Sequence, residues 1–365
     1  MKNGSKLLSI LLKVSEKAAN IARACRQNDA LFKLLVQEKF EEEKNPRFFR
    51  DFKTLADVLI QETIRHDIEV EFPELAKVVL GEETNTFSNA MGESIVVRVC
   101  PTSEETTQLL AKVMGSDIET AELLATEVHK DIEFLDVPMI PELPLDFDIN
   151  VDDLGIWIDP IDSTADYING GVKVDDATGI HLSGLRCVTV LIGAYLKSTA
   201  MPVLGVINQP FYTNVDLLWK GKCYWGFVGN NIGKSSVVKE PNNKKIIVLS
   251  RVEDANIKSK LLSAGFTLVE AAGAGYKTLN VVLGQADAYV LSKSSTYKWD
   301  TCGPHALLRS LGGGIIEFRS FVSNSDSNYS DVKYISTTNN FSNLNGLVAY
   351  RNFETLETLK AVLRE

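Results

Sequence analysis

A short apolar run that ends abruptly in carboxylates and hydroxyls is the strongest constraint on how this 365-residue chain folds. Residues 154–158 are Leu-Gly-Ile-Trp-Ile, and residues 159–164 are Asp-Pro-Ile-Asp-Ser-Thr. Unbroken apolar residues predict a strand that is buried on both faces. Asp159 and Asp162 can both reach one site at the carboxyl end of that strand if the chain turns after Ile161. We therefore expect a buried strand with two carboxylates at its end.

The two hydroxyl residues that follow extend this prediction. Ser163 and Thr164 begin a segment that resembles a first helical turn, where backbone N–H groups have no partner within the helix. Such N–H groups attract an anion, whereas carboxylates suit a hard cation. The combination predicts metal-assisted phosphate chemistry. The simpler alternative is a strand that ends in an aspartate-rich turn without any site.

The charge balance and the cysteines narrow the class of protein. The chain has 38 basic and 48 acidic residues and a formal net charge of -10, which argues against non-specific nucleic-acid binding. Its five cysteines are scattered and form no Cys-x-x-Cys pair, which favours buried thiols in a reducing compartment. The most apolar stretch near the N-terminus, residues 7–12, is too short for a signal peptide or a membrane span. We expect a cytoplasmic monomer that binds a small molecule and neither nucleic acid nor membrane.

The spacing of apolar residues predicts an α/β protein. Residues 5–38 have apolar groups at helical spacing and predict one or two long helices, whereas strands dominate residues 186–249. From residue 266 to 318, predicted strands alternate with predicted helices, which favours a layered architecture.

The length permits one large domain or two lobes. We expect an N-terminal α+β lobe, residues 1–245, that carries most of the metal ligands. A C-terminal α/β lobe, residues 246–365, would carry Lys277 and Asp300.

Three further acidic residues lie where a site could form. Glu82 and Glu83 follow a predicted strand at residues 78–80, and sites in α/β proteins commonly form at the carboxyl ends of strands. Asp300 precedes a predicted helix that has Pro304 in its first turn, a position that proline tolerates. Each of these residues, taken alone, could instead be a helix cap or a surface charge.

Asp57 is a weaker candidate. It lies three residues after Thr54, so the two side chains share one face of a predicted helix. An aspartate in this setting is more often a solvated surface charge.

A segment rich in small residues offers a contact to a ligand. Gly273 and Ala274 lie in a turn that precedes a predicted helix, and Lys277 lies within the first turn of that helix. Such a turn lets the backbone approach a ligand closely, and the lysine could meet a phosphate as a point charge. A plain tight turn without a ligand remains the alternative.

Other chemistries lack their signatures. The four histidines show no metal-ligand spacing, which argues against zinc. No phosphate-binding loop of the Gly-x-x-x-x-Gly-Lys type and no Gly-x-Ser-x-Gly motif occurs in the chain.

Taken together, the motifs resemble a known superfamily. The pattern at residues 159–164, with Trp299-Asp300 far downstream, is similar to that of the lithium-sensitive, magnesium-dependent phosphomonoesterases. These form the inositol monophosphatase and fructose-1,6-bisphosphatase superfamily. Within it, the chain most resembles the enzymes that act on inositol polyphosphates, over nearly its full length. The segments that carry the resemblance are 14–27, 51–57, 81–83, 154–157, 205–211 and 273–277.

The resemblance implies a fold and a metal site. The fold would be a five-layer αβαβα sandwich, and the cofactor would be two or three magnesium ions. Glu82, Asp159 and the carbonyl of Ile161 would hold the first ion, with Glu83 as a further candidate. The second ion would be held by Asp159, Asp162 and Asp300. Asp57 would lie near the first ion, where lithium is thought to compete, and calcium should inhibit because it prefers looser coordination.

The resemblance also implies a reaction. The expected activity is removal of the 1-phosphate of inositol 1,4-bisphosphate and inositol 1,3,4-trisphosphate. Glu82 and Thr164 would orient the attacking water, with Asp57 as an acceptor for its proton. Substrate contacts would come from the segments already described, at Asp162, Ser163, Thr164, Gly273, Ala274 and Lys277.

Two other activities stay open: removal of the 3′-phosphate from adenosine 3′,5′-bisphosphate on the same metal core, and non-catalytic binding of inositol phosphates. The chain also departs from the family pattern. Gly303 and Pro304 replace the usual small residues after Asp300, and Val252 and Asp254 stand where serine or lysine is expected. Contacts to a second phosphate are therefore not defined by the sequence.

Overall fold

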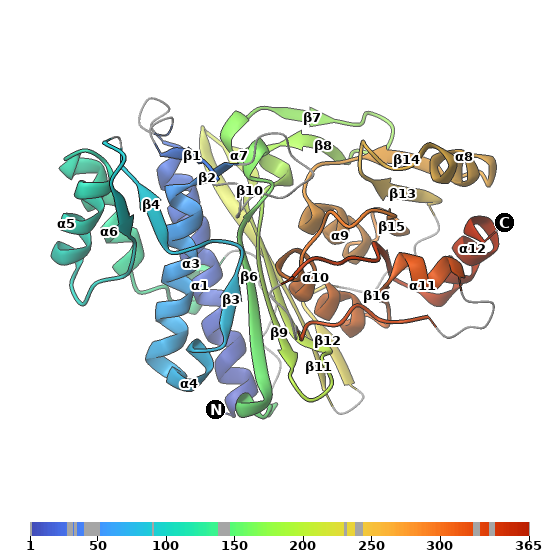
Figure 1. Cartoon of the computed structure of the whole chain (residues 1–365), viewed down its shortest axis with the longest axis horizontal. Coiled ribbons are helices and arrows are strands. Elements are labelled where there is room, and N and C mark those ends of the chain that lie inside the picture. The colour runs from blue at the N-terminus through green and yellow to red at the C-terminus, as the bar shows by residue number, and fades with distance from the viewer. Residues whose placement is uncertain are drawn as a thin grey trace.

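Two β-sheets with helices between them form the centre of the protein, and further helices cover both outer faces (Figure 1). The computed structural model describes residues 2–27, 32, 35–39, 52–89, 91–137, 147–229, 232–237, 244–323, 329–335 and 340–364. The layers follow the order helix, sheet, helix, sheet, helix, so the predicted five-layer αβαβα sandwich is confirmed.

In the described part of the chain, the first sheet has six strands in the order β12-β11-β10-β9-β6-β3. All neighbours pair antiparallel except β3 and β6, which are parallel. The strands are β3 (Val79–Gly81), β6 (Leu154–Asp162), β9 (Thr189–Leu196), β10 (Pro202–Val215), β11 (Leu218–Gly229) and β12 (Ile232–Ser235). The predicted strand at 78–80 and the hairpin around residues 197–199 are confirmed, because β9 and β10 pair across that turn.

The second sheet, as far as the described residues show it, has five strands in the order β14-β13-β15-β17-β16. Its strands are β13 (Ile246–Leu249), β14 (Thr267–Glu270), β15 (Ala288–Leu291), β16 (Gly314–Ile316) and β17 (Leu347–Tyr350). Strands β14, β13 and β15 are parallel, so their carboxyl ends lie along one edge of the sheet. The first sheet uses strands before residue 246 and the second uses strands after it, but helices α9 and α10 pack against both sheets.

Within the described residues, three two-stranded sheets lie outside these layers. They pair β1 (Val36–Glu38) with β2 (Phe52–Thr54), β4 (Thr86–Ser88) with β5 (Ser94–Val96), and β7 (Val172–Val174) with β8 (His181–Gly184).

The helices in the described part of the chain are α1 (Asn3–Cys25), α3 (Leu55–Glu71), α4 (Pro73–Ala76), α5 (Ser103–Val113), α6 (Ile118–His129), α7 (Thr164–Asn169), α8 (Ala255–Ser263), α9 (Ala274–Val282), α10 (Lys298–Ser310), α11 (Phe318–Ser323) and α12 (Phe353–Leu363). Helices α1 and α3 cover the outer face of the first sheet, and α8, α11 and α12 cover the outer face of the second (Figure 1). None of the helices in the described part of the chain combines the length and the apolar character that a membrane-spanning helix needs.

Among the residues that the structure describes, three apolar cores join the five layers, and strand alternation divides the side chains among them. On β6, Ile156 enters the core beneath α1 and α3, whereas its neighbour Trp157 faces the inner helices. On β13, Val248 faces the inner helices and Ile247 faces α8 and α12. Both faces of these strands are buried, which explains why the predicted strand at residues 154–158 is apolar throughout.

A bulge at the end of β6 aims the two predicted carboxylates at one site. Asp159 pairs with Leu191 and Asp162 with Thr189, so one extra residue is inserted on β6. Without that residue, side chains three positions apart would face opposite sides of the sheet. The predicted turn after Ile161 therefore takes the form of a bulge within the strand.

The start of α10 differs from the sequence prediction. The helix begins at Lys298, so Asp300 lies in its first turn and Pro304 lies in its interior. The prediction that Pro304 is in the first turn and that Asp300 precedes the helix is wrong. Proline in a helix leaves the carbonyl four residues earlier without its N–H partner, here that of Asp300 itself.

The close packing of α10 on the first sheet explains the glycine at position 303. A Cβ atom on Gly303 would lie 2.7 Å from the carbonyl oxygen of Ile192 on β9. A Cβ atom on Gly193 of the same strand would lie 2.2 Å from the nitrogen of Gly303. The two backbones touch, so a side chain at either position would push α10 and Asp300 away from β6.

Candidate active site

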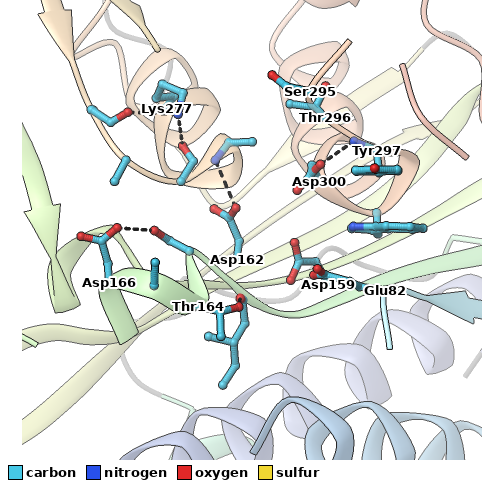
Figure 2. A pocket seen from close by; sticks show the side chains of 18 of the residues that line it. Glu82, Asp159, Asp162, Thr164, Asp166, Lys277, Ser295, Thr296, Tyr297 and Asp300 are labelled. Atoms are coloured by element: carbon cyan, nitrogen blue, oxygen red, sulfur yellow. Dashed lines mark hydrogen bonds between the residues drawn. The ribbon is translucent and has the colours of Figure 1, made fainter. Parts of the chain in front are cut away.

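Asp159, Asp162, Glu82 and Asp300 converge on one cavity of about 220 Å³ between the two sheets (Figure 2). Glu82 follows β3, both aspartates end β6, and Asp300 comes from α10. The N-terminal ends of α7 and α9 complete the wall, with Ser163 to Asp166 on one side and Gly273, Ala274 and Lys277 on the other. The cavity is therefore built from segments that are more than 200 residues apart in the chain.

Three carboxylates lie close enough to bind one cation. One oxygen each of Asp159, Asp162 and Asp300 lies within 4.8 Å of the others. Burial, followed by the charges of Glu82 and Asp162, raises the pKa of Asp159 well above its ordinary value. Burial and the charge of Asp162 likewise raise the pKa of Asp300. Carboxylates this close repel one another unless a proton or a cation lies between them.

One oxygen at the centre of the site has no protein partner. Oδ1 of Asp159 is buried and accepts no hydrogen bond from the described residues. A buried carboxylate oxygen without a donor is costly, and a metal ion would satisfy it. The donor set contains only hard oxygens, which suits magnesium better than a softer metal.

Asp162 is held by the N-terminus of α9. Its carboxylate accepts hydrogen bonds from the N–H groups of Ala274 at 3.1 Å and Gly275 at 2.9 Å, and from the hydroxyl of Thr189 at 3.2 Å. Burial raises the pKa of Asp162, and the nearby Lys277 opposes that rise. The sequence predicted that the N-terminus of α9 would contact a ligand, and in the structure it binds the carboxylate of Asp162.

Glu82 and Glu83 share one lysine. Nζ of Lys39 lies 2.6 Å from Oε1 of Glu82 and 2.7 Å from Oε1 of Glu83. Glu82 lines the cavity, whereas Glu83 does not. The backbone of Glu83 exchanges two hydrogen bonds with the side chain of Gln61. Burial raises the pKa of Glu83 to about 8, although Lys39 favours its charged form.

Asp57 is buried beneath the site and does not line the cavity. Its carboxylate accepts hydrogen bonds from the backbone N–H of Thr54 at 2.7 Å and from its hydroxyl at 2.6 Å, which closes a capping box at the start of α3. Burial raises the pKa of Asp57 to about 7. Its surroundings exclude the alternative of a solvated surface charge.

The hydroxyls after β6 have local partners. Thr164 donates to the carbonyl of Ile161 at 3.1 Å, and Ser163 donates to Asp166 at 2.7 Å. Ser163 has a left-handed φ of 74° and precedes α7, so the predicted helix start is confirmed. Both residues line the cavity with Ile161. Among the described residues, no hydrogen bond joins Thr164 to Asp57.

Lys277 is buried and supports the turn before α9. Its ammonium donates to the carbonyls of Gly273 at 2.8 Å and Ala271 at 3.1 Å, and it lies 5.2 Å from the ring centre of Tyr289. Gly273 has a left-handed φ of 71°. The lysine thus stabilises the segment that presents N–H groups to Asp162, and its side chain also borders the cavity (Figure 2).

Several residues of the site were not predicted from the sequence. Lys39 lies in a charged run that gave no sign of burial, and most of that run lies outside the described residues. Asp166 is bound by Ser163 and by the N–H of Gly184. The rings of Tyr297 and Trp299 stack 4.6 Å apart at the edge of the cavity. The sequence gives one sign of this pair, because Tyr297 and Trp299 are separated by a single residue just before Asp300.

Curated proteins include close relatives of this chain over nearly its whole length. It is 44% identical to inositol polyphosphate 1-phosphatase of Bos taurus, over 97% of this chain and 96% of that protein. It is 43% identical to the Homo sapiens protein of the same name, over 98% and 97%. A more distant relative is the 3'(2'),5'-bisphosphate nucleotidase 1 of Dictyostelium discoideum, which is 30% identical over 58% of this chain and 65% of that protein.

A solved structure agrees with the fold. The inositol monophosphatase of Zymomonas mobilis aligns with a TM-score of 0.51 and 13% identity, covering 98% of this chain and 97% of that one. The family model described as the inositol monophosphatase family matches residues 8–320, which include every acidic residue of the site. With its five layers and its buried carboxylates, the chain belongs to the inositol monophosphatase family.

Proposed function

We propose that this protein is a magnesium-dependent phosphomonoesterase that removes the 1-phosphate of inositol 1,4-bisphosphate and inositol 1,3,4-trisphosphate. The observation that carries the proposal is the convergence of Asp159, Asp162 and Asp300 in a chain that is 44% identical to an inositol polyphosphate 1-phosphatase. The identity extends over nearly the whole length of both chains, which supports a shared substrate class as well as a shared fold.

The carboxylates would hold two or three magnesium ions. Glu82, Asp159 and the carbonyl of Ile161 would form one site, and Asp159, Asp162 and Asp300 a second. Asp57 and Glu83 are further candidates behind Glu82. When bound, the ions would neutralise the phosphate ester and assist departure of the inositol oxygen. We also propose that lithium and calcium inhibit, calcium because its larger, looser coordination misplaces the reacting groups.

The chain's own groups would position the water and the phosphate. Thr164 and Glu82 both border the cavity. Together they would orient the attacking water and accept its proton. Asp57 could receive that proton only after Thr164 turns away from Ile161. The N–H groups at the start of α7 would hold the phosphoryl oxygens, which gain negative charge in the transition state.

The role proposed for Lys277 differs from the one predicted from the sequence, which was contact with the substrate. The same holds for the turn at Gly273 and Ala274. Because Lys277 donates to two carbonyls of this turn, we propose that it holds the turn and Asp162 in place. Substrate contact would be a second role of the same side chain.

A phosphate-release assay tests the proposal. The purified protein should turn over inositol 1,4-bisphosphate with magnesium and lose activity with chelator or calcium. Asp159→Asn should abolish turnover and keep the fold, whereas Asp216→Asn, which removes a charge from the exposed β10–β11 turn, should change nothing. Full activity in chelator would contradict the metal site.

A substrate comparison tests the specificity. Adenosine 3′,5′-bisphosphate assayed beside inositol 1,4-bisphosphate separates the two related activities. Faster turnover of the nucleotide would contradict the proposed substrate, and binding of either without turnover would favour a non-catalytic role.

We also propose that the protein acts as a cytoplasmic monomer without nucleic-acid or membrane partners. The five free cysteines are all buried, which is compatible with a reducing compartment. Light scattering of the purified protein tests the monomer.

A further inference from the structure

Asp300 reaches the active site from the first turn of α10, and this turn has weak support within the helix. The N-cap position is Tyr297, and tyrosine is not among the residues whose side chains commonly cap a helix. Pro304 has no N–H group, so the carbonyl of Asp300 lacks its usual helical partner. A carboxylate on such a turn needs contacts from outside the helix to keep its place.

The backbone of Tyr297 holds the carboxylate of Asp300. Its N–H donates a hydrogen bond to Oδ2 of Asp300 (Figure 2). One oxygen of Asp300 lies within 4.8 Å of oxygens of Asp159 and Asp162. The position of the Tyr297 backbone therefore affects how Asp300 faces the other two carboxylates.

An asparagine from a distant loop holds that backbone. Asn343 precedes β17, and its side chain is buried. Its Nδ2 lies 2.9 Å from the carbonyl oxygen of Tyr297 and 3.2 Å from the hydroxyl oxygens of both Thr296 and Thr301. A carbonyl oxygen can only accept a hydrogen bond, so the amide nitrogen of Asn343 must face Tyr297. We call these three contacts the Asn343 clamp.

The hydroxyl of Thr301 completes the clamp. It donates to the carbonyl of Tyr297 at 3.2 Å and accepts from Asn343 at 3.2 Å, which a hydroxyl can do at the same time. Thr301 follows Asp300 directly in the sequence and is fully buried. The clamp therefore holds residues on both sides of Asp300.

The loop that carries Asn343 is itself fixed. The N–H of Asn343 donates to the carbonyl of Thr296 at 2.7 Å, and the N–H of Gly346 donates to the carbonyl of Asn343 at 3.1 Å. Gly346 has a left-handed φ of 64°, and a Cβ atom there would lie 2.3 Å from the carbonyl oxygen of Leu291 at the end of β15. The loop thus packs against the second sheet, which gives Asn343 a defined position.

We propose that Asn343 is a positioning residue for the metal site. It is not among the described residues that line the active-site cavity, so it acts on the site through the first turn of α10. By holding that turn, it keeps Asp300 facing Asp159 and Asp162. The inference rests on the proposed function, because it assumes that these carboxylates bind magnesium.

The magnesium affinity of two asparagine variants tests the clamp. Asn343→Ala is compared with Asn352→Ala, because the Asn352 side chain caps α12 by accepting from the N–H of Thr355 at 2.8 Å, on the outer face of the second sheet. Both variants should unfold at a lower urea concentration than the unaltered protein. Only Asn343→Ala should bind magnesium more weakly, by about 3- to 10-fold, the range expected for one lost hydrogen bond. The magnesium dependence of the unfolding midpoint measures this affinity without any assay of activity.

A second pair of variants covers the case in which Asn343→Ala does not fold. Thr301→Val keeps the shape of the side chain but removes the hydroxyl that contacts both Tyr297 and Asn343. Thr301→Ser retains that hydroxyl. Thr301→Val should therefore weaken magnesium binding, and Thr301→Ser should not.

Kinetics provide a separate measurement. The magnesium concentration for half-maximal phosphate release should rise by the same factor as the dissociation constant for magnesium. KM for inositol 1,4-bisphosphate at saturating magnesium should not change, since Asn343 does not border the cavity.

The outcomes separate the clamp from the proposed function. If Asn343→Ala, or Thr301→Val in its place, binds magnesium as tightly as its control, the clamp is overturned. If magnesium stabilises the unaltered protein but no phosphate is released, the proposed reaction is wrong, and the same comparison of variants still decides the clamp. If magnesium does not stabilise the unaltered protein, the metal site is wrong and the role of Asn343 falls with it.

Discussion

Nζ of Lys39 lies 2.6 Å from Oε1 of Glu82, a residue that lines the active-site cavity. The same ammonium group lies 2.7 Å from Oε1 of Glu83, so one buried lysine forms ion pairs with two adjacent glutamates. Lys39 follows β1, which pairs with β2 just before α3. A small sheet at the edge of the fold therefore brings a positive charge to the Glu82 side of the site, whereas Lys277 borders the cavity beside Asp162.

Lys39→Met should destabilise the protein without magnesium by about 3–5 kcal/mol, because it leaves the buried carboxylate of Glu83 without its cation. Magnesium should restore much of this stability, since a divalent cation supplies the missing charge. Urea unfolding with chelator and with magnesium measures both effects. Lys77→Met is the control, because its pair with Glu74 is exposed and should contribute less than about 1 kcal/mol. A loss of stability that magnesium does not reduce would show that Lys39 acts through packing.

Gly273→Ala should lower turnover by disturbing Asp162. A Cβ atom at this position would lie 2.8 Å from Oδ2 of Asp162 and 2.9 Å from the carbonyl oxygen of Cys187. Gly265→Ala is the matched control, since Gly265 also has a left-handed φ but a Cβ atom there would meet no other atom within 4 Å. Both variants should lose about 1–2 kcal/mol of stability from backbone strain. Only Gly273→Ala should lose more than about tenfold in kcat/KM, and equal activity of the two variants would contradict the contact.

Thr164→Ala should lower kcat by about 10²- to 10⁴-fold, the usual contribution of a group that positions a proton transfer. Thr164→Ser retains the hydroxyl that donates to Ile161 and should keep most of the activity. Steady-state rates on inositol 1,4-bisphosphate provide the comparison. An effect on KM alone would mean that Thr164 binds the phosphate and does not orient the water.

His305 should make the folded protein less stable in acid. Burial, followed by the charges of Arg309 and Lys333, lowers its pKa well below the ordinary value. The folded state therefore keeps His305 neutral, whereas the unfolded chain binds a proton below about pH 6.5. The contribution of His305 to the free energy of unfolding is thus complete above that pH and is lost as pH falls, by up to about 1.4 kcal/mol per pH unit.

Urea unfolding between pH 7.5 and pH 5 measures this slope. His305→Gln should reduce this pH dependence of the free energy of unfolding by the contribution of one proton. Tyr334→Phe removes only the hydroxyl that lies 3.0 Å from Nδ1 of His305 and should keep the slope. Identical slopes for the unaltered protein and His305→Gln would refute the assignment.

Local sequence patterns predicted the parts of this protein that depend on neighbouring residues. The strand at residues 154–158 is apolar because both of its faces are buried. The hydroxyl residues that follow this strand predicted the start of α7. Periodicity likewise predicted the layers, since helices and strands alternate along the second half of the chain. The family motifs identified Asp159, Asp162 and Asp300, which the fold then brings within 4.8 Å of one another.

Only the tertiary structure decided what each candidate binds. Pro304 lies within α10, next to Gly303, whose backbone packs closely against β9. Asp162 accepts from the N-terminus of α9, more than 110 residues away, and Lys39 reaches Glu82 from a separate sheet. Such contacts leave no periodic trace in the sequence, because a hydrogen bond or an ion pair depends on distances of a few ångströms that are set by how the layers stack. The chain itself therefore determines its layers and its acidic motifs, and the stacking of those layers determines which charges meet.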